Sequence, residues 1–188
     1  MPLYPASSSE IDRYADEQQL LDAAYGILAA TFDRRCVPTT VGSYASGTVR
    51  AGAVGLTAGV TVGTLGLCIV TAGVGLTAAR LGVYDSAFSL RGQTADMSVA
   101  FGSAGWKTAA LTVPYAIPTT GLYYLAVFQT YATTAALMAA DNAAGVTNAR
   151  EAIVGGGARG GWKQVGQVAL PDPAVPTESG FMPLLIAA

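Results

Sequence analysis

The sequence contains no histidine among its 188 residues, and only 12% of its residues are charged. Without histidine there is no serine–histidine triad, no cysteine–histidine pair and no histidine-ligated zinc site. A soluble domain usually carries about 25% charged residues, and a formal net charge of −2 leaves no basic footprint for nucleic acid. We therefore expect a protein that is not an enzyme, holds no cofactor or metal ion and binds no nucleic acid.

Cysteine is almost as scarce, since the chain contains only Cys36 and Cys68. Two thiols are too few for a metal-binding set of cysteines. In an oxidising setting they could pair and tie the N-terminal segment to the rest of the chain, but sequence alone does not place their Cα atoms within reach. The sequence favours two buried free thiols over a disulfide.

The few charges are unevenly distributed along the chain. Between residues 51 and 140 there are only five charged side chains: Arg80, Asp85, Arg91, Asp96 and Lys107. A free monomer normally covers its surface with charge to remain soluble. We therefore expect this part of the protein to bury much of its surface against other subunits or against lipid.

A membrane-spanning segment is the less favoured of these two explanations. The 29 residues between Arg50 and Arg80 are uncharged and long enough to cross a bilayer. They include seven glycines and five threonines, however, and this composition favours strands and turns over a helix. The start of the chain is acidic and lacks an apolar run, so we expect neither a membrane span nor a signal peptide.

An amphipathic helix is predicted near the N-terminus, from Ser9 to Phe32. Ser9 and Asp12 have the spacing of a capping box, and apolar residues then recur at steps of three and four. Such a stripe packs either on its own domain or on a neighbouring subunit, and we take residues 1–47 as an attachment segment with its loop. The residues expected to form the interface are Ile11, Tyr14, Leu21, Tyr25, Leu28 and Phe32.

Period-two patterns and turn residues dominate the remainder of the chain. Many short strands without helices between them predict an antiparallel β-sandwich or barrel, with residues 48–170 as its domain. The turn signals include Asp85-Ser86 and Asp141-Asn142. The predicted strands are residues 48–57, 61–71, 75–84, 88–96, 106–113, 121–131, 134–140, 161–170 and 181–187.

The C-terminal segment, residues 171–188, combines a proline-stiffened connection with the apolar sequence FMPLLIAA. An apolar terminus of this kind is rarely left in water. It either returns as a final strand of its own sheet or docks into a partner, and the sequence leaves both possibilities open.

Two kinds of side chain in the β-rich part could form a site. Asp85 and Asp96 are the carboxylates available for a glycosidase pair, but both lie beside turn residues and are expected to cap turns. The aromatic residues could line a carbohydrate-binding face, but in strands they more often fill cores and interfaces. These aromatic residues are Tyr4, Tyr14, Tyr25, Tyr44, Tyr84, Tyr115, Tyr123, Tyr124, Tyr131, Trp106 and Trp162.

One stretch resembles a known family. ARLGVYDS (residues 79–86) and WKTAALTVPYAIPTTGLYYLAVF (residues 106–128) resemble jelly-roll-like β-sandwich modules in virion proteins of tailed phages of actinobacteria. The resemblance covers about half of the chain, roughly residues 48–140, and rests on a strand–turn–strand and a hairpin, not on a catalytic motif. It implies a mainly β protein with an antiparallel jelly-roll-like sandwich.

The resemblance also implies a structural role on the outside of a capsid or tail. The short chain favours a capsid decoration or accessory head protein, which forms a homo-oligomer, with a trimer expected, and contacts other virion proteins such as the major capsid protein. The N-terminal helix would then hold the shell or a neighbour. The alternative is a minor tail or tail-tip module that binds a host-surface receptor or glycan.

Overall fold

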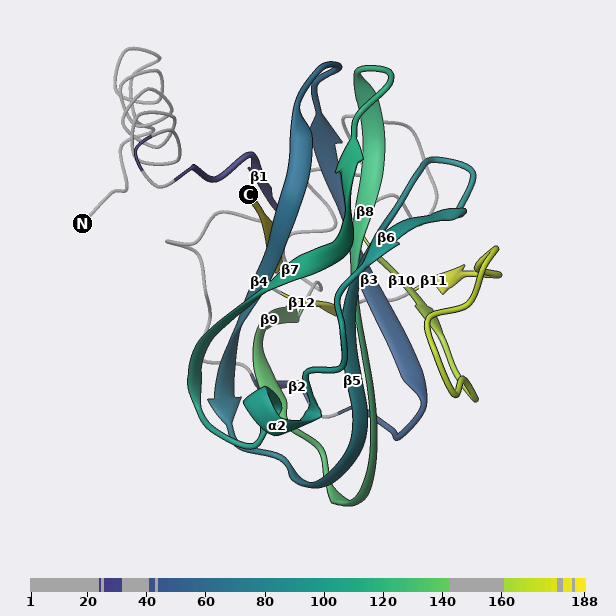
Figure 1. The fold of residues 1–188 in the computed structure, drawn as a ribbon. Coiled ribbons are helices and arrows are strands. Elements are labelled where there is room, and N and C mark those ends of the chain that lie inside the picture. Colours follow the sequence, from purple (N-terminus) through teal and green to yellow (C-terminus); the bar gives the residue numbers. More distant parts are fainter. Residues whose placement is uncertain are drawn as a thin grey trace, which may run out of the picture.

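The computed structural model describes residues 24, 26–31, 41–42, 44–142, 161–178, 181–183 and 185–188. In these residues the protein is mainly β and forms two antiparallel sheets, with one short helix (Figure 1). The elements are β1 (Ala29–Ala30), β2 (Val41–Gly42), β3 (Thr48–Leu56), β4 (Thr61–Thr71), β5 (Val74–Tyr84), β6 (Leu90–Gln93), α2 (Ser98–Phe101), β7 (Gly105–Ala116), β8 (Gly121–Thr134), β9 (Leu137–Asn142), β10 (Gly161–Gln164), β11 (Thr177–Glu178), β12 (Phe181–Pro183) and β13 (Leu185–Ala187).

The predicted antiparallel sandwich is confirmed, and each predicted strand overlaps a strand of the structure. One predicted turn is wrong. Asp141 and Asn142 end β9 and pair with Met182 and Phe181 of β12. The two residues favour turns locally, but pairing with a strand from the C-terminus outweighs that preference.

The predicted N-terminal helix is wrong for residues 26–31. Leu28 precedes β1 and donates its backbone N–H to the carbonyl of Ala187 at 2.8 Å, and β1 pairs with β13 in an antiparallel register. Hydrogen bonds to the C-terminal strand hold the chain extended here, although the apolar spacing is helical. The other five members of the predicted stripe, Ile11, Tyr14, Leu21, Tyr25 and Phe32, lie outside the described residues.

Four nested antiparallel pairs form the centre of the fold. β2 pairs with β9, β3 with β8, β4 with β7 and β5 with β6. Further pairing of β9 with β4 and of β8 with β5 joins these ribbons into two sheets, in the orders β2-β9-β4-β7 and β3-β8-β5-β6. A bridge between Thr94 and Leu111 links the two sheets along one side.

The strands added at the margins come mostly from the C-terminal part of the chain. β10 pairs with β3, and β11 pairs with β10. β12 lies on β9, whereas β13 lies between β4 and β1. The apolar C-terminus therefore returns as part of its own sheet, which is one of the two possibilities that the sequence left open.

The main core lies between the two sheets. Leu65, Leu67 and Ile69 of β4 face Leu81 of β5 and Leu125 of β8, and all five are almost fully buried. Apolar residues alternate with others along each strand because successive side chains point to opposite faces. The uncharged stretch between Arg50 and Arg80 thus forms strands, and among the described residues no helix has the length and apolar character needed to cross a membrane.

A second apolar cluster covers the outer face of the β3-β8-β5 sheet. Trp162 of β10 packs there with Tyr84, Tyr124 and Phe128, and residues 165–176 run over them. The hydroxyl of Tyr84 donates to the carbonyl of Pro171 at 2.8 Å. This sheet is therefore covered on both faces by the protein's own chain.

Candidate functional site

The turn between β5 and β6 is held by one carboxylate. Oδ1 of Asp85 accepts hydrogen bonds from the backbone N–H groups of Ala87 at 2.9 Å and Ser89 at 3.0 Å. Asp96 caps the turn that leads into α2, since its carboxylate accepts from the backbone N–H of Ser98 at 3.3 Å and from the Ser98 hydroxyl at 2.6 Å. The prediction that both aspartates cap turns is confirmed.

Phe88 fixes this turn against the outer face of the sheet. Its φ of 61° lies in the left-handed region, which residues other than glycine rarely adopt. The Phe88 ring stacks on Tyr124 with 5.2 Å between ring centroids, and the Phe88 carbonyl accepts from the backbone N–H of Ala174 at 2.9 Å. The turn is thus anchored by aromatic packing and by the segment that covers the sheet.

The turn between β7 and β8 lies at the same end of the sandwich, opposite α2 (Figure 1). The hydroxyl of Thr120 accepts from the backbone N–H of Ala58 at 2.9 Å, and Ile117 exchanges backbone hydrogen bonds with the β3–β4 connection. Tyr123 donates its hydroxyl to the carbonyl of Thr119 at 2.9 Å. These bonds hold the β7–β8 turn in a defined position beside the β5–β6 turn.

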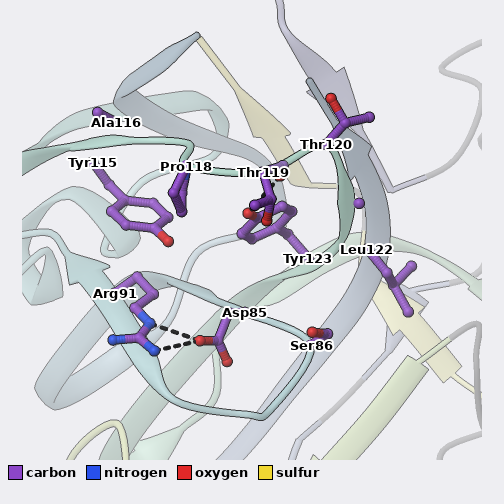
Figure 2. A pocket seen from close by; sticks show the side chains of 11 residues that line it. Asp85, Ser86, Arg91, Tyr115, Ala116, Pro118, Thr119, Thr120, Leu122 and Tyr123 are labelled. Carbon is purple, nitrogen blue, oxygen red and sulfur yellow. Dashed lines mark hydrogen bonds and ion pairs between the residues drawn. The ribbon is translucent and has the colours of Figure 1, made fainter. Parts of the chain in front are cut away.

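A groove of about 570 Å³ opens between these two turns (Figure 2). The β5–β6 turn and Arg91 form one wall, and the end of β7, the β7–β8 turn and the start of β8 form the other. The lining residues are Asp85, Ser86, Arg91, Tyr115, Ala116, Pro118, Thr119, Thr120, Gly121, Leu122 and Tyr123.

An ion pair lies in the wall of the groove. Nε and Nη2 of Arg91 both contact Oδ2 of Asp85, at 2.7 and 2.6 Å. Burial opposes the charge of Asp85, but hydrogen bonds from Arg91 and from two backbone N–H groups outweigh this effect and hold the pKa of the carboxyl below its usual range. Both partners are therefore charged at neutral pH.

Two tyrosines face this ion pair across the groove. The rings of Tyr115 and Tyr123 are 6.3 Å apart and inclined at 62°. Partial burial, together with the neighbouring Tyr123, raises the pKa of Tyr115, so its hydroxyl keeps its proton at neutral pH. The groove thus combines aromatic surface with charged and hydroxyl groups that can donate or accept hydrogen bonds.

A second surface feature is the outer side of β4, β7 and β13, which we call the uncharged face. On β4 the residues between the buried Leu65, Leu67 and Ile69 point outward, and the strand register sets them beside outward residues of β7 and β13. The uncharged face consists of Thr64, Gly66, Cys68, Val70, Trp106, Thr108, Ala110 and Ile186.

Apolar side chains on this face are open to solvent. Trp106 is 52% exposed and Val70 is 46% exposed. Cys68 is a half-buried free thiol, while Cys36 lies outside the described residues. The face therefore presents aromatic and aliphatic surface without a charged side chain.

Comparison with protein-family models, with curated proteins and with solved structures finds no match for this chain. Among the described residues, no three acidic or cysteine side chains gather where they could hold a metal ion. The groove and the uncharged face are the two surface features that bear on function.

The residues singled out from the sequence differ in how deeply the structure buries them. Four of the predicted core tyrosines, Tyr44, Tyr84, Tyr123 and Tyr124, are buried as expected, and so is Trp162. Trp106 is not buried, and Leu28 is 38% exposed at the margin of the β13 sheet.

Sequence reasoning treated Asp85 as a turn cap and did not detect its pairing with Arg91. The six-residue separation of the two side chains across a turn was the signal that could have revealed the pair.

Proposed function

We propose that this protein is a non-enzymatic structural protein of a tailed phage, namely a capsid decoration or accessory head protein that forms a homo-oligomer on the particle surface. The observation that carries the proposal is the uncharged face. One sheet is covered on its outer side by residues 165–176, whereas the other presents Trp106 and Val70 to solvent. Exposed apolar surface of this kind is typical of protein–protein contacts.

The partners of the few charged side chains support this interpretation. Arg91 pairs with Asp85, and Lys107 donates to Ser103 and to the carbonyl of Ala104 at the α2 end. Arg80 donates to Gln93 at 3.3 Å. None of these charges lies on the uncharged face, so a second copy of the chain could cover it without burying an unpaired charge.

We further infer that the sandwich is a jelly roll. In a jelly roll, a long antiparallel ribbon of eight strands is rolled up, so that the first strand pairs with the eighth, the second with the seventh, and so on. The nested pairs β2–β9, β3–β8, β4–β7 and β5–β6 follow this rule. This strand order supports the resemblance to phage virion modules that was noted from residues 48–140.

Self-association of the purified chain tests the role of the uncharged face. A tryptophan side chain carries roughly 200 Å² of surface, so the exposed half of Trp106 offers about 100 Å² and about 2.5 kcal/mol per copy when buried. We expect an oligomer, with a trimer as the first expectation. Trp106→Glu should weaken its association by about two orders of magnitude.

The matched control introduces the same charge away from this face. Val168 lies in the segment that covers the other sheet and is 90% exposed, so Val168→Glu should leave association unchanged. Sedimentation of the three proteins, with circular dichroism to establish folding, separates the outcomes. A monomeric wild type that also fails to bind phage particles would contradict the proposal.

A second candidate is a minor tail or tail-tip module that binds a host-surface receptor or glycan. The groove between the β5–β6 and β7–β8 turns favours it, because the groove joins the ring of Tyr115 to the Asp85–Arg91 pair. Position on the particle separates the two candidates: a head protein is found over the capsid surface, and a tail module only at the tail.

A further inference from the structure

The groove contains hydrogen-bond donors that meet no acceptor in the described part of the chain. A guanidinium has five N–H bonds, and Arg91 directs two of them, at Nε and Nη2, to Asp85. The other three meet no acceptor among the described residues, and the side chain is 45% exposed. The ion pair fixes the plane of the guanidinium. The three remaining N–H groups therefore point in fixed directions and do not sample many orientations.

The carboxylate holds Arg91 in place more than it attracts a ligand. Both oxygens of Asp85 are already occupied, one by two backbone N–H groups and the other by Arg91. The hydroxyl of Ser86, an exposed residue, and the protonated hydroxyl of Tyr115 add further polar groups to the lining. A ligand in the groove therefore meets donors and hydroxyls, not a free negative charge.

Apolar surface lies on the opposite wall. Tyr115 and Pro118 line the groove across from the ion pair (Figure 2). Flat aromatic and proline surfaces pack well against the C–H faces of a ring. The combination of ring surface on one wall and a fixed fork of donors on the other suits a molecule that has an apolar face and hydroxyls at its edge.

The charge balance argues against an anionic ligand. Arg91 is the only cation in the lining, and Asp85 neutralises it. Asp172 lies nearby as well and accepts from the backbone N–H of Leu90 at 3.0 Å. Phosphate or a sulfated group would meet no net positive charge here, so the ligand is expected to be neutral.

We propose that the groove between the β5–β6 and β7–β8 turns is a binding site for a neutral saccharide. The sugar hydroxyls accept hydrogen bonds from the three free N–H groups of Arg91, and a sugar ring packs on Tyr115. The volume of about 570 Å³ lies within the range of ligand pockets, about 300–1,000 Å³, and accommodates a short oligosaccharide. The proposed saccharide site does not depend on whether the protein lies on the head or on the tail of the particle.

The walls are already organised for binding. Asp85 caps the β5–β6 turn, Phe88 anchors it to Tyr124, and Thr120 holds the β7–β8 turn to Ala58. A ligand therefore needs to order little of the protein, and preorganisation of this kind reduces the entropy cost of binding. A neutral saccharide makes weak individual contacts and depends on such preorganisation.

A glycan array probed with the purified protein tests the proposal. We expect retention by neutral glycans. The strongest neutral binder is then titrated into the labelled protein, where NMR should show shifts at the Nε–H of Arg91 and at the amides of Ala87 and Ser89. Inorganic phosphate, titrated in parallel, should leave these signals unchanged.

Substitution of Arg91, whose guanidinium supplies the N–H donors, gives the decisive comparison. Arg91→Gln should weaken binding of the selected glycan at least tenfold, and Arg91→Lys should do the same because it keeps the charge but loses the planar fork. Lys107→Gln is the matched control, since it removes one positive charge at the α2 end and should bind like wild type. Thermal unfolding of each variant checks that the fold is retained.

Three results would overturn the proposal: no neutral glycan is retained on the array, phosphate shifts the Arg91 signals in place of a glycan, or Arg91→Gln binds as tightly as wild type. None of them bears on the oligomeric structural role, which is measured by sedimentation and by position on particles.

Discussion

Removal of the Trp162 indole should unfold the second apolar cluster at a large cost in stability. Trp162 is 1% exposed, and its ring meets Tyr84, Phe88 and Tyr124 with centroid distances of 5.3, 6.1 and 6.4 Å. Replacing a buried tryptophan with alanine costs about 3–5 kcal/mol. For a domain of this size, a loss of about 4 kcal/mol lowers the melting temperature by about 8–16 °C.

A second variant separates packing from polar effects. Nε1 of Trp162 is buried and has no hydrogen-bond partner among the described residues, and an unsatisfied buried donor costs about 1–3 kcal/mol. Trp162→Phe removes this donor and leaves a small cavity that costs about 1 kcal/mol. The two effects offset each other, so we expect the stability of Trp162→Phe to lie within about 1 kcal/mol of wild type.

Denaturant unfolding followed by circular dichroism measures both variants. The reasoning is refuted if Trp162→Ala loses less than about 1 kcal/mol, because the cluster on the outer face would then not contribute to the fold. It is also refuted if Trp162→Phe loses as much as Trp162→Ala, because the buried N–H would then have a partner that stabilises it.

Two further predictions rest on described contacts, and a third tests the interface stripe predicted from the sequence. Burial opposes the charge of Asp85 and Asp96, but hydrogen bonds outweigh it and hold the pKa values of both carboxyls low. The two carboxylates therefore stabilise the fold above the unfolded pKa of about 3.9, and this stabilisation is lost as the pH falls through the lower folded pKa values. The melting temperature, measured as a function of pH, should decline below about pH 4. Gln129→Leu should lower the free energy of unfolding by about 2–4 kcal/mol, because the Gln129 amide satisfies a buried N–H and a buried carbonyl of the β8–β9 connection. Denaturant unfolding measures this loss, and a variant as stable as wild type would show that these hydrogen bonds contribute nothing. Leu21→Asp and Leu28→Asp should reduce incorporation of the protein into particles, measured by particle composition. The β domain should stay folded in both variants, measured by circular dichroism. Unfolding of the whole protein would assign these residues to the core instead.

The strands were predictable from sequence because local signals agree with the fold. Leu65, Leu67 and Ile69 alternate with smaller residues, as a half-buried strand requires, and turn residues such as Asp85 mark the ends of strands. The wrong predictions arise where distant pairing decides the outcome. At Leu28 the three- and four-residue spacing of apolar side chains favours a helix, but hydrogen bonds to the last strand hold the chain extended.

The groove was less predictable than the strands. Asp85 and Arg91 are close in sequence, but Tyr115 reaches them only because β6 and β7 are brought together by the link between the two sheets. The sequence also gives no sign of which sheet is covered by residues 165–176 and which is left open. Composition predicted that much surface would be buried against other subunits or lipid, and the strand register was needed to locate the exposed apolar face around Trp106.

The position of the protein on purified phage particles tests the central claim most directly. Gold-labelled antibody against this chain, imaged by electron microscopy on gradient-purified particles, shows whether the protein is present and where. The proposed structural role predicts label in many copies over the outer surface of the head. Particles that carry no label, although the chain is expressed in the same infected cells, would contradict it.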